Sequence, residues 1–174
     1  MRQVIITAAA AIALSACTAT VTSGEPPVAT IAQPSVTTTT TTPPLSKEAA
    51  AKHYLAIVKP YNEALERLEQ AINNGKPIDV QRGAATETLQ ANEEQIRQLK
   101  AALWPEDIRT AVDELVAESG KAQEFWRKAS EAQTRDQVVE QVRAALKHDG
   151  TAAAKTIRER LELAKYDERD YGGS

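Results

Sequence analysis

A repeat of apolar residues runs through most of the chain, at alternating intervals of four and three positions. In residues 54–72 the repeat comprises Tyr54, Val58, Tyr61, Leu65, Leu68 and Ile72. This alternation keeps side chains on one face of an α-helix, whereas a β-strand would need an interval of two. Two later stretches repeat the alternation: Ala85, Leu89, Asn92, Ile96, Leu99, Leu103; and Ile108, Val112, Leu115, Ser119, Ala122, Trp126, Ala129. A third stretch carries Val138, Val139, Val142 and Leu146, and its helical periodicity resumes with Ala153, Ile157, Leu161 and Ala164. The chain therefore predicts an all-α fold.

Residues that start and stop helices divide the first half of this repeat. Ser46 is predicted to cap the first helix, and Asn74-Gly75 to end it, because glycine readily adopts the left-handed conformation that follows a helix. Asp79 is predicted to cap the second helix. Pro60 lies inside the first helix and is predicted to bend it, since proline removes a backbone donor.

The second half is divided in the same way. Trp104-Pro105 separates the second helix from the third, because the residue before proline avoids the α conformation and proline suits the start of a helix. Thr134 and Gln137 have the spacing of a capping box and open a fourth helix, which is either broken or continuous near Gly150. Similar lengths and short connections predict an up-down four-helix bundle over residues 46–166.

The start of the chain has the pattern of an export signal. Arg2 precedes a run over residues 4–14 that is apolar apart from Thr7 and too short to span a bilayer comfortably, so we expect residues 1–16 to be a signal peptide. The tetrapeptide Leu14-Ser15-Ala16-Cys17 resembles the lipobox of bacterial lipoproteins. The resemblance implies cleavage before Cys17, and a mature protein anchored by lipid to the extracytoplasmic face of the cell membrane. An ordinary secretory leader with an accidental cysteine is the alternative.

Residues 17–45 have the composition of a spacer. They contain five prolines, six consecutive threonines at 37–42, no aromatic residue and a single charge at Glu25. Such a segment cannot bury enough apolar surface to offset its ordering entropy, so we expect a disordered tether. A flexible tail is predicted for residues 167–174, where the apolar period is lost.

The charge and cysteine content exclude several kinds of partner. Removing residues 1–16 removes one Arg, so the 21 basic residues become 20 against 24 acidic ones, and the net charge changes from −3 to −4. Without a basic excess we expect no nucleic-acid partner. The single cysteine excludes an intrachain disulfide and any metal site built from several thiolates.

Catalytic patterns are missing from the sequence. The two histidines are His53 and His148, and neither follows a Glu by three residues, as a di-iron bundle would require. No Gly-rich phosphate loop and no nucleophile motif is present. We therefore expect no enzyme activity, no cofactor and no metal. His53 is expected to face water, and His148 to face water or interact with the last carbonyl groups of a helix.

Two positions of the apolar repeat are polar, Asn92 and Ser119. Buried polar groups of this kind usually fix the register of packed helices. The alternative is a cleft for a small ligand, lined by these residues and Trp126. Trp104 is a candidate contact with a protein partner if it is exposed.

Two segments carry a family resemblance. Residues 104–109 read Trp-Pro-x-Asp-apolar-Arg at the start of the third helix, and Ile157-Arg158-Glu159-Arg160-Leu161-Glu162-Leu163 lies near the end. Together they resemble small actinobacterial lipoproteins of the mycobacterial type, which have a leader, a Thr- or Pro-rich tether and an all-helical domain. The resemblance implies a cell-envelope setting and no particular activity. Those proteins tend to end in Leu-Gly-Leu-Pro, where this chain has Leu161-Glu162-Leu163-Ala164.

The sequence thus leads to one functional expectation with two alternatives. We expect a lipid-anchored, non-enzymatic binding or interaction module of the cell envelope, with the membrane and an envelope protein as partners. The first alternative is a carrier of a small apolar ligand between the helices. The second is a phage or prophage superinfection-exclusion lipoprotein. An interaction role predicts an exposed apolar patch, whereas ligand carriage predicts a cavity.

Overall fold

The computed structural model describes residues 43–164, and all regular structure in this range is helical. The elements are α1 (Lys47–Asn73), α2 (Ile78–Ala101), α3 (Glu106–Glu131), α4 (Arg135–Ala145), the short 3₁₀ turn η1 (Leu146–His148) and α5 (Thr151–Arg160). The predicted all-α class is confirmed. The predicted signal peptide, Cys17 and the predicted tail lie outside the described residues.

Most of the predicted helix ends are confirmed. Ser46 caps α1 by accepting a hydrogen bond from the Ala49 N–H at 3.2 Å. Gly75 follows α1 with a φ of 60°, the left-handed conformation that glycine adopts at low cost. Thr134 and Gln137 form both halves of the capping box that opens α4.

Two predictions about α2 are wrong. Asp79 does not cap this helix, because Pro77 is the capping residue and Asp79 lies in the first turn. Leu103 was assigned to the buried stripe, but α2 ends at Ala101 and the Leu103 side chain is 51% exposed. The backbone is already extended at Ala102, three residues before Pro105, so the helix ends earlier than predicted. In α1, Pro60 lies inside the helix, which continues from Lys47 to Asn73 without a break.

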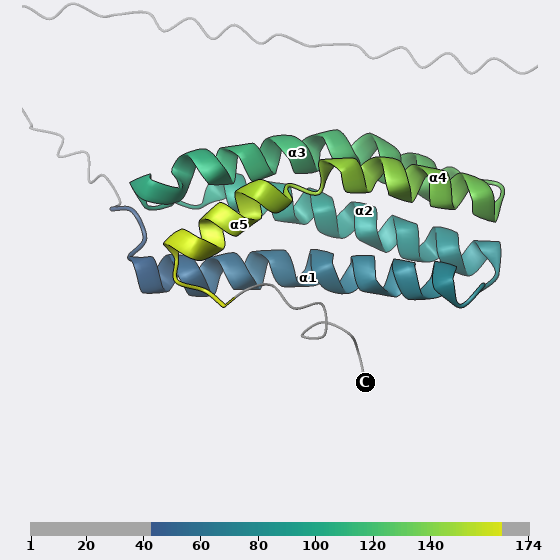
Figure 1. The fold of residues 1–174 in the computed structure, drawn as a ribbon, viewed down its shortest axis with the longest axis horizontal. Helices are drawn as coiled ribbons and strands as arrows, with labels where there is room; N and C mark the ends of the chain where they lie inside the picture. The colour runs from purple at the N-terminus through teal and green to yellow at the C-terminus, as the bar shows by residue number, and fades with distance from the viewer. Residues whose placement is uncertain (1–42, 165–174) are drawn as a thin grey trace, which may run out of the picture. The chain divides into compact units, whose positions relative to one another are not determined.

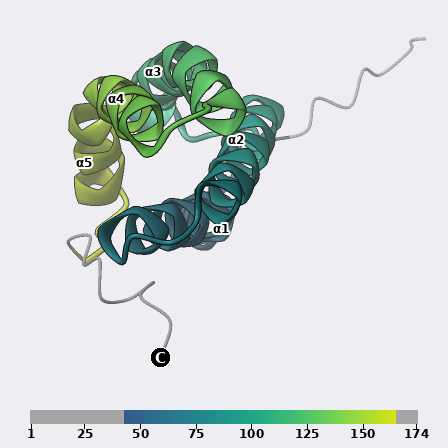
Figure 2. The same ribbon diagram turned by 90° about the vertical axis from the view of Figure 1, so that its right-hand side faces the viewer.

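Successive helices α1 to α4 run in alternating directions along one axis (Figure 1). α1 packs on α2, α2 on α3, and α3 on both α4 and α5. Viewed along the axis, α1 lies at one end of this series and the α4–α5 arm at the other (Figure 2). The backbone of α1 makes no comparably extensive contact with that arm over the described residues.

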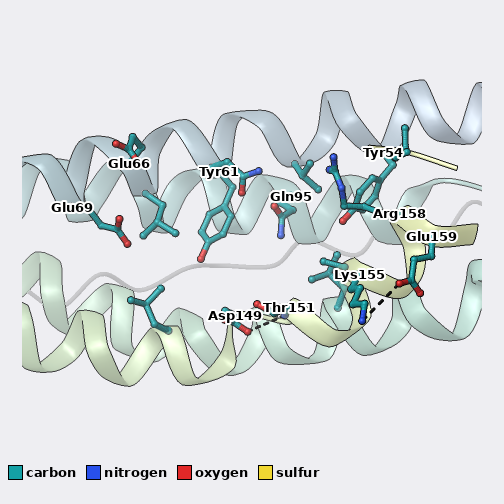
Figure 3. A pocket seen from close by; sticks show the side chains of 17 residues that line it. Tyr54, Tyr61, Glu66, Glu69, Gln95, Asp149, Thr151, Lys155, Arg158 and Glu159 are labelled. Atoms are coloured by element: carbon teal, nitrogen blue, oxygen red, sulfur yellow. Dashed lines mark hydrogen bonds and ion pairs between the residues drawn. The ribbon is translucent and has the colours of Figure 1, made fainter. Parts of the chain in front are cut away.

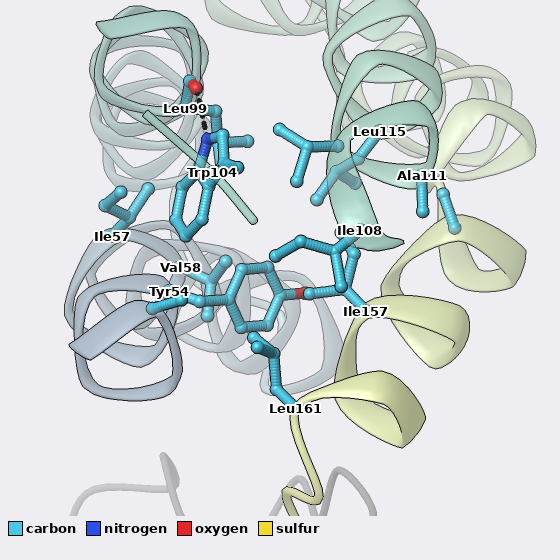
Figure 4. Close-up of a cluster of buried hydrophobic side chains, with 13 residues drawn as sticks. Tyr54, Ile57, Val58, Leu99, Trp104, Ile108, Ala111, Leu115, Ile157 and Leu161 are labelled. Carbon is cyan, nitrogen blue, oxygen red and sulfur yellow. Dashed lines mark hydrogen bonds between the residues drawn. The ribbon is translucent and has the colours of Figure 1, made fainter. Parts of the chain in front are cut away.

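The buried apolar side chains form two separate clusters. The Trp104 cluster joins the first half of α1 to α3 and α5, and Figure 4 shows its interior. It comprises Ala50, Tyr54, Ile57, Val58, Leu99, Trp104, Ile108, Ala111, Val112, Leu115, Ala153, Ile157 and Leu161. The Trp126 cluster joins the second half of α1 to α4 and comprises Leu68, Ile72, Ala85, Ala122, Trp126, Ala129, Ala132, Val138, Val142 and Ala145. The segment from Thr41 to Ser174 forms a compact unit that contains both clusters, so we expect it to fold alone.

The last arm of the fold is broken, which answers the question that the sequence left open. α4 ends at Ala145, η1 follows, and Gly150 has a left-handed φ of 65° before α5 begins. The Asp149 side chain accepts a hydrogen bond from the Thr151 N–H at 2.9 Å and so supports the new helix start. A Cβ on Gly150 would lie 2.5 Å from Leu115 Cδ1, so glycine also permits close packing on α3.

The chain leaves α5 through a second left-handed residue, Glu162, with a φ of 56°. The N–H of Leu163 donates to the carbonyl of Arg158 at 2.9 Å, which closes the helix end. Glycine is the usual residue at such a position, because it adopts the left-handed conformation at low cost. In this chain the Glu162 carboxylate instead pairs with Lys47 of α1 at 2.6 Å.

Candidate functional site

A groove of about 810 Å³ lies between α1 and the η1–α5 segment (Figure 3). One wall comes from α1 and the other from the broken arm. Gln95 of α2 and Leu115 of α3 contribute to its inner surface. The residues lining the groove are Tyr54, Val58, Tyr61, Asn62, Leu65, Glu66, Glu69, Gln95, Leu115, Leu146, Asp149, Thr151, Ala154, Lys155, Arg158, Glu159 and Leu163.

The groove lies between the two regions where α1 meets the broken arm, which are the two apolar clusters. α5 contributes to the Trp104 cluster and α4 to the Trp126 cluster, and the turn at Gly150 lies between them. Beside that turn, Tyr61 and Leu65 of α1 remain only partly buried, although both belong to the predicted core stripe. Their exposed faces line the groove.

A polar layer of Asn92, Gln95 and Ser119 lies inside the bundle at this level. The Asn92 side chain donates through Nδ2 to the Ser119 carbonyl at 2.9 Å, and Gln95 donates through Nε2 to Ser119 Oγ at 3.3 Å. All three side chains are buried, with relative exposures of 0% for Asn92, 3% for Gln95 and 5% for Ser119. The layer ties α2 to α3 and contributes one of its members, Gln95, to the groove.

Several buried polar atoms lack a hydrogen-bond partner within the described residues. They are Gln81 Oε1, Asn92 Oδ1, Gln95 Oε1 and Trp126 Nε1. A buried polar group without a partner costs on the order of 1 to 3 kcal/mol. Of these four residues, Gln95 alone lines the groove, although its Oε1 atom is itself buried.

Charged side chains of α5 line part of the groove. Lys155 pairs with Glu159 at 3.8 Å, one turn along α5. Arg158 donates from Nε and Nη2 to the carbonyl of Ala164 at 2.8 and 2.6 Å. Both cationic groups therefore have acceptors within the protein.

The structure brings some of the predicted site residues together and separates others. Asn92 and Ser119 are in direct contact, as described above. Trp126 is fully buried, and its ring meets Tyr61 edge-on at 6.4 Å between centroids, so it lies behind the groove wall. Trp104 is 4% exposed in the other cluster and donates to the Leu99 carbonyl at 2.7 Å, so it offers little surface to a protein partner. Leu14, Ser15, Ala16 and Cys17 lie outside the described residues.

His148 takes a position that the sequence did not indicate. Its Nδ1 lies 3.0 Å from Glu118 Oε2, and its ring stacks on Phe125 at 5.8 Å, so it neither caps a helix nor simply faces water. Hydrogen bonds with Lys121 and His148 lower the pKa of Glu118 below its ordinary value. The cluster joins η1 to α3. His53 is exposed as predicted, with its ring 5.6 Å from that of Trp104.

The sequence prediction missed Gln95, and the reason is visible along α2. The buried positions of this helix are Gln81, Ala85, Thr88, Asn92, Gln95 and Leu99. They keep the alternation of four and three, but half of the predicted apolar stripe, Leu89, Ile96 and Leu103, is not among them. The polar residue Asn92 was the one sign in the sequence that pointed to Gln95, because Gln95 lies one helical turn further along the same face.

Comparison of the chain with protein-family models, curated proteins and solved structures finds no match. Within residues 43–164, no helix combines the length and apolar character needed to cross a membrane. The same residues hold no group of three or more His, Cys, Asp or Glu side chains arranged to bind a metal ion. The groove is therefore the candidate site, and its assignment is based on the geometry of this chain alone.

Proposed function

We propose that the protein is a lipid-anchored binding module of the bacterial cell envelope that carries a small, largely apolar ligand in the groove. Cys17 would hold it to the extracytoplasmic face of the membrane. The scaffold in this proposal is an up-down four-helix bundle in which α4, η1 and α5 together form the fourth helix. The observation that carries the proposal is the groove beside the buried, unpartnered Gln95.

The size and lining of the groove support a small-molecule ligand. Binding pockets for small molecules usually measure about 300 to 1,000 Å³ and combine apolar walls with a few polar groups. The groove measures about 810 Å³. Val58, Leu65, Leu115, Leu146 and Leu163 supply aliphatic surface from several elements.

A protein-docking role has less support in residues 43–164. The exposed large apolar side chains in this range are Val80, at 46%, and Leu103, at 51%. Val80 lies in the first turn of α2 and Leu103 follows its last, so they lie far apart and do not form one patch. Specific protein interfaces usually centre on contiguous, well-packed anchors.

The proposal that the protein is not an enzyme is supported by the missing catalytic motifs and by the surroundings of His148. His148 contacts the Glu118 carboxylate and the Phe125 ring, and neither is a hydroxyl or thiol nucleophile. A nucleophile and its base must lie within hydrogen-bond reach to act together. A hydrolase activity that is lost in His148→Gln would contradict this part.

The proposed lipid anchor at Cys17 is supported by the tetrapeptide Leu14-Ser15-Ala16-Cys17, which follows the apolar run near the start of the sequence. Two acyl chains on one cysteine suffice for stable membrane attachment. Cys17→Ser should remain uncleaved or be released from membranes on fractionation. If it is processed and sediments like the wild type, the anchoring proposal is wrong.

Ligand carriage is tested by filling the groove. Ala154 lines the groove, whereas Ala152 is an exposed residue on the same helix that does not. Both alanines would be changed to Phe in the lipidated protein, which is purified from its membrane and examined by native mass spectrometry. We expect a co-purifying small molecule in the wild type and in Ala152→Phe, and its loss in Ala154→Phe. Equal retention in both variants, or no such molecule in the wild type, would contradict ligand carriage.

A further inference from the structure

A second hollow lies at the end of the bundle where α1 begins and α2 ends. It measures about 560 Å³ and lies beside the first turns of α1 and the connection from α2 to α3. The N–H of Leu45 donates to the Leu103 carbonyl at 2.8 Å, which holds the chain that enters α1 against this connection. We call this site the entry hollow, and it is lined by Pro43, Leu45, Ala49, Lys52, His53, Ala56, Ala102 and Leu103.

The surface of the entry hollow is mostly apolar and open to solvent. Leu103 is 51% exposed, and Pro43, Ala49 and Ala56 are exposed beside it. Among the described residues, the other exposed large apolar side chain is Val80, at 46%. A helix rises about 1.5 Å per residue, so Val80, in the first turn of α2, lies roughly 35 Å from Leu103, at the opposite end of the bundle. The two side chains match in exposure and differ in the end that they occupy.

The ionisable side chains that line the entry hollow are basic. They are Lys52 and His53, and no carboxylate contributes to the lining. Within the part of the chain that the structure describes, neither side chain belongs to an ion pair. Three acidic residues of the same end, Glu48, Glu106 and Asp107, do not line the hollow. The hollow therefore suits an anionic surface better than a cationic one.

The chain that precedes the entry hollow leads to the proposed lipid anchor. Residues 17–42 connect Cys17 to Pro43, which itself lines the hollow. A flexible chain of this length spans roughly 30 Å, whereas α1 alone is about 40 Å long. The anchor therefore keeps this end of the bundle nearer to the bilayer than the opposite end. A short flexible link also gives an effective concentration in roughly the millimolar range, so a weak attraction to the surface is sufficient.

We propose that the entry hollow is a membrane-contact surface, which rests on the bilayer around the anchor and inserts Leu103 into it. This inference rests on the proposed function, because it needs the anchor at Cys17, but it does not depend on the ligand groove. A membrane contact requires no complementary partner surface. An exposed apolar side chain enters the boundary between head groups and acyl chains, and a lysine such as Lys52 binds anionic head groups. The contact orients the bundle, with Val80 at the end that lies away from the bilayer.

The test attaches the chain from Cys17 to Ser174 to vesicles through its only thiol. The Cys17 thiol is coupled to a maleimide-bearing lipid in vesicles of phosphatidylcholine and phosphatidylglycerol. This coupling keeps residues 17–42 and does not depend on lipidation in the cell. A failure of the anchoring proposal, which fractionation of Cys17→Ser detects, is therefore distinguishable from a failure of this inference.

Matched tryptophan probes then report which end meets the lipid. Leu103→Trp and Val80→Trp are compared with the wild type in vesicles with and without brominated phosphatidylcholine, which quenches tryptophan close to the acyl chains. We expect about twofold quenching of the added fluorescence in Leu103→Trp, because a side chain at this boundary lies about 5 to 10 Å deep. Val80→Trp should behave like the wild type. Equal quenching of the two added probes, or quenching of neither, overturns the inference.

Charge variants test the same surface without an added probe. The Cys17 thiol is blocked with iodoacetamide, and binding of the free chain to the same vesicles is measured by flotation. Leu103→Asp should weaken binding about three- to tenfold, the loss expected when the exposed half of a leucine no longer enters the lipid, whereas Val80→Asp should not. Lys52→Gln should weaken binding about fivefold, and Lys76→Gln, at the opposite end, should leave it unchanged. Equal effects within either pair, or no wild-type binding at lipid concentrations of about a millimolar, overturn the inference.

Other occupants of the entry hollow would give different results. If residues 17–42 cover it, their removal increases vesicle binding. If a second copy covers it, sedimentation shows a dimer that Leu103→Asp dissociates. Either result overturns the proposal, and circular dichroism verifies that each variant keeps its helices.

Discussion

Gly150→Ala tests whether the break between η1 and α5 depends on glycine. The residue has a φ of 65°, which costs a non-glycine residue about 1 to 2 kcal/mol. The new Cβ would also lie 2.5 Å from Leu115 Cδ1, in the Trp104 cluster, where crowding of this kind costs about 1 to 3 kcal/mol. The two costs together predict a loss of roughly 2 to 5 kcal/mol of unfolding free energy.

Gly75→Ala is the matched control for the first of these costs. Gly75 has a φ of 60°, but a Cβ there would have no atom within 4 Å. Only the backbone cost applies, so we expect a loss of about 1 to 2 kcal/mol. Gly120→Ala, inside α3 and equally open, should instead stabilise the fold by about 0.5 to 1 kcal/mol.

Urea denaturation of the Thr41–Ser174 unit, followed by far-ultraviolet circular dichroism, measures all three variants. A double-mutant cycle of Gly150→Ala with Leu115→Ala then isolates the contact between the two residues. We expect the cost of Gly150→Ala to fall toward that of Gly75→Ala when Leu115 is truncated. The reasoning is refuted if Gly150→Ala and Gly75→Ala are equally destabilising in the wild-type background.

Three further outcomes can be checked with the same assay. Leu99→Ala, at a side chain 1% exposed, should cost roughly 2 to 5 kcal/mol, whereas Leu103→Ala, 51% exposed, should stay within about 0.5 kcal/mol; equal effects would contradict the burial assignment. The lowered pKa of Glu118 means that its charged form adds stability above its ordinary pKa of 4.5, which is lost as the pH falls through the folded-state value. The stability difference between the wild type and Glu118→Gln should therefore shrink below pH 4.5, and a constant difference would oppose the assignment. Glu162→Gly should raise stability by up to about 1 kcal/mol, because the relief of left-handed strain outweighs the exposed pair with Lys47; a loss would show that the pair is the stronger.

The sequence predicted α3 most completely, for a physical reason. Every residue of its predicted stripe, from Ile108 to Ala129, is buried, including Ser119. α3 packs against α2, α4 and α5, so its apolar face is covered along its whole length. Where a helix face is fully covered, apolar spacing and burial coincide.

The groove could not be predicted from apolar spacing, because some of its apolar residues are partly exposed and one of its polar residues is buried. Tyr61 and Leu65 are apolar positions left partly uncovered, and Gln95 is a polar position that is buried. Periodicity does not show where two helices separate. That separation follows from the turn at Gly150, and the sequence was compatible with either a broken or a continuous helix there.

The two apolar clusters share no side chain, so we expect two regions of the domain to open separately. α5 is held through the Trp104 cluster and α4 through the Trp126 cluster, so either end can open while the other keeps its packing. Amide hydrogen exchange should then give different opening free energies for α4 and α5. A molecule lying along the groove would touch Leu146 on one side of the break and Leu163 beyond α5, and would join the two parts into one unit. Slower exchange at both ends at once would therefore report occupancy of the groove without any change of fold.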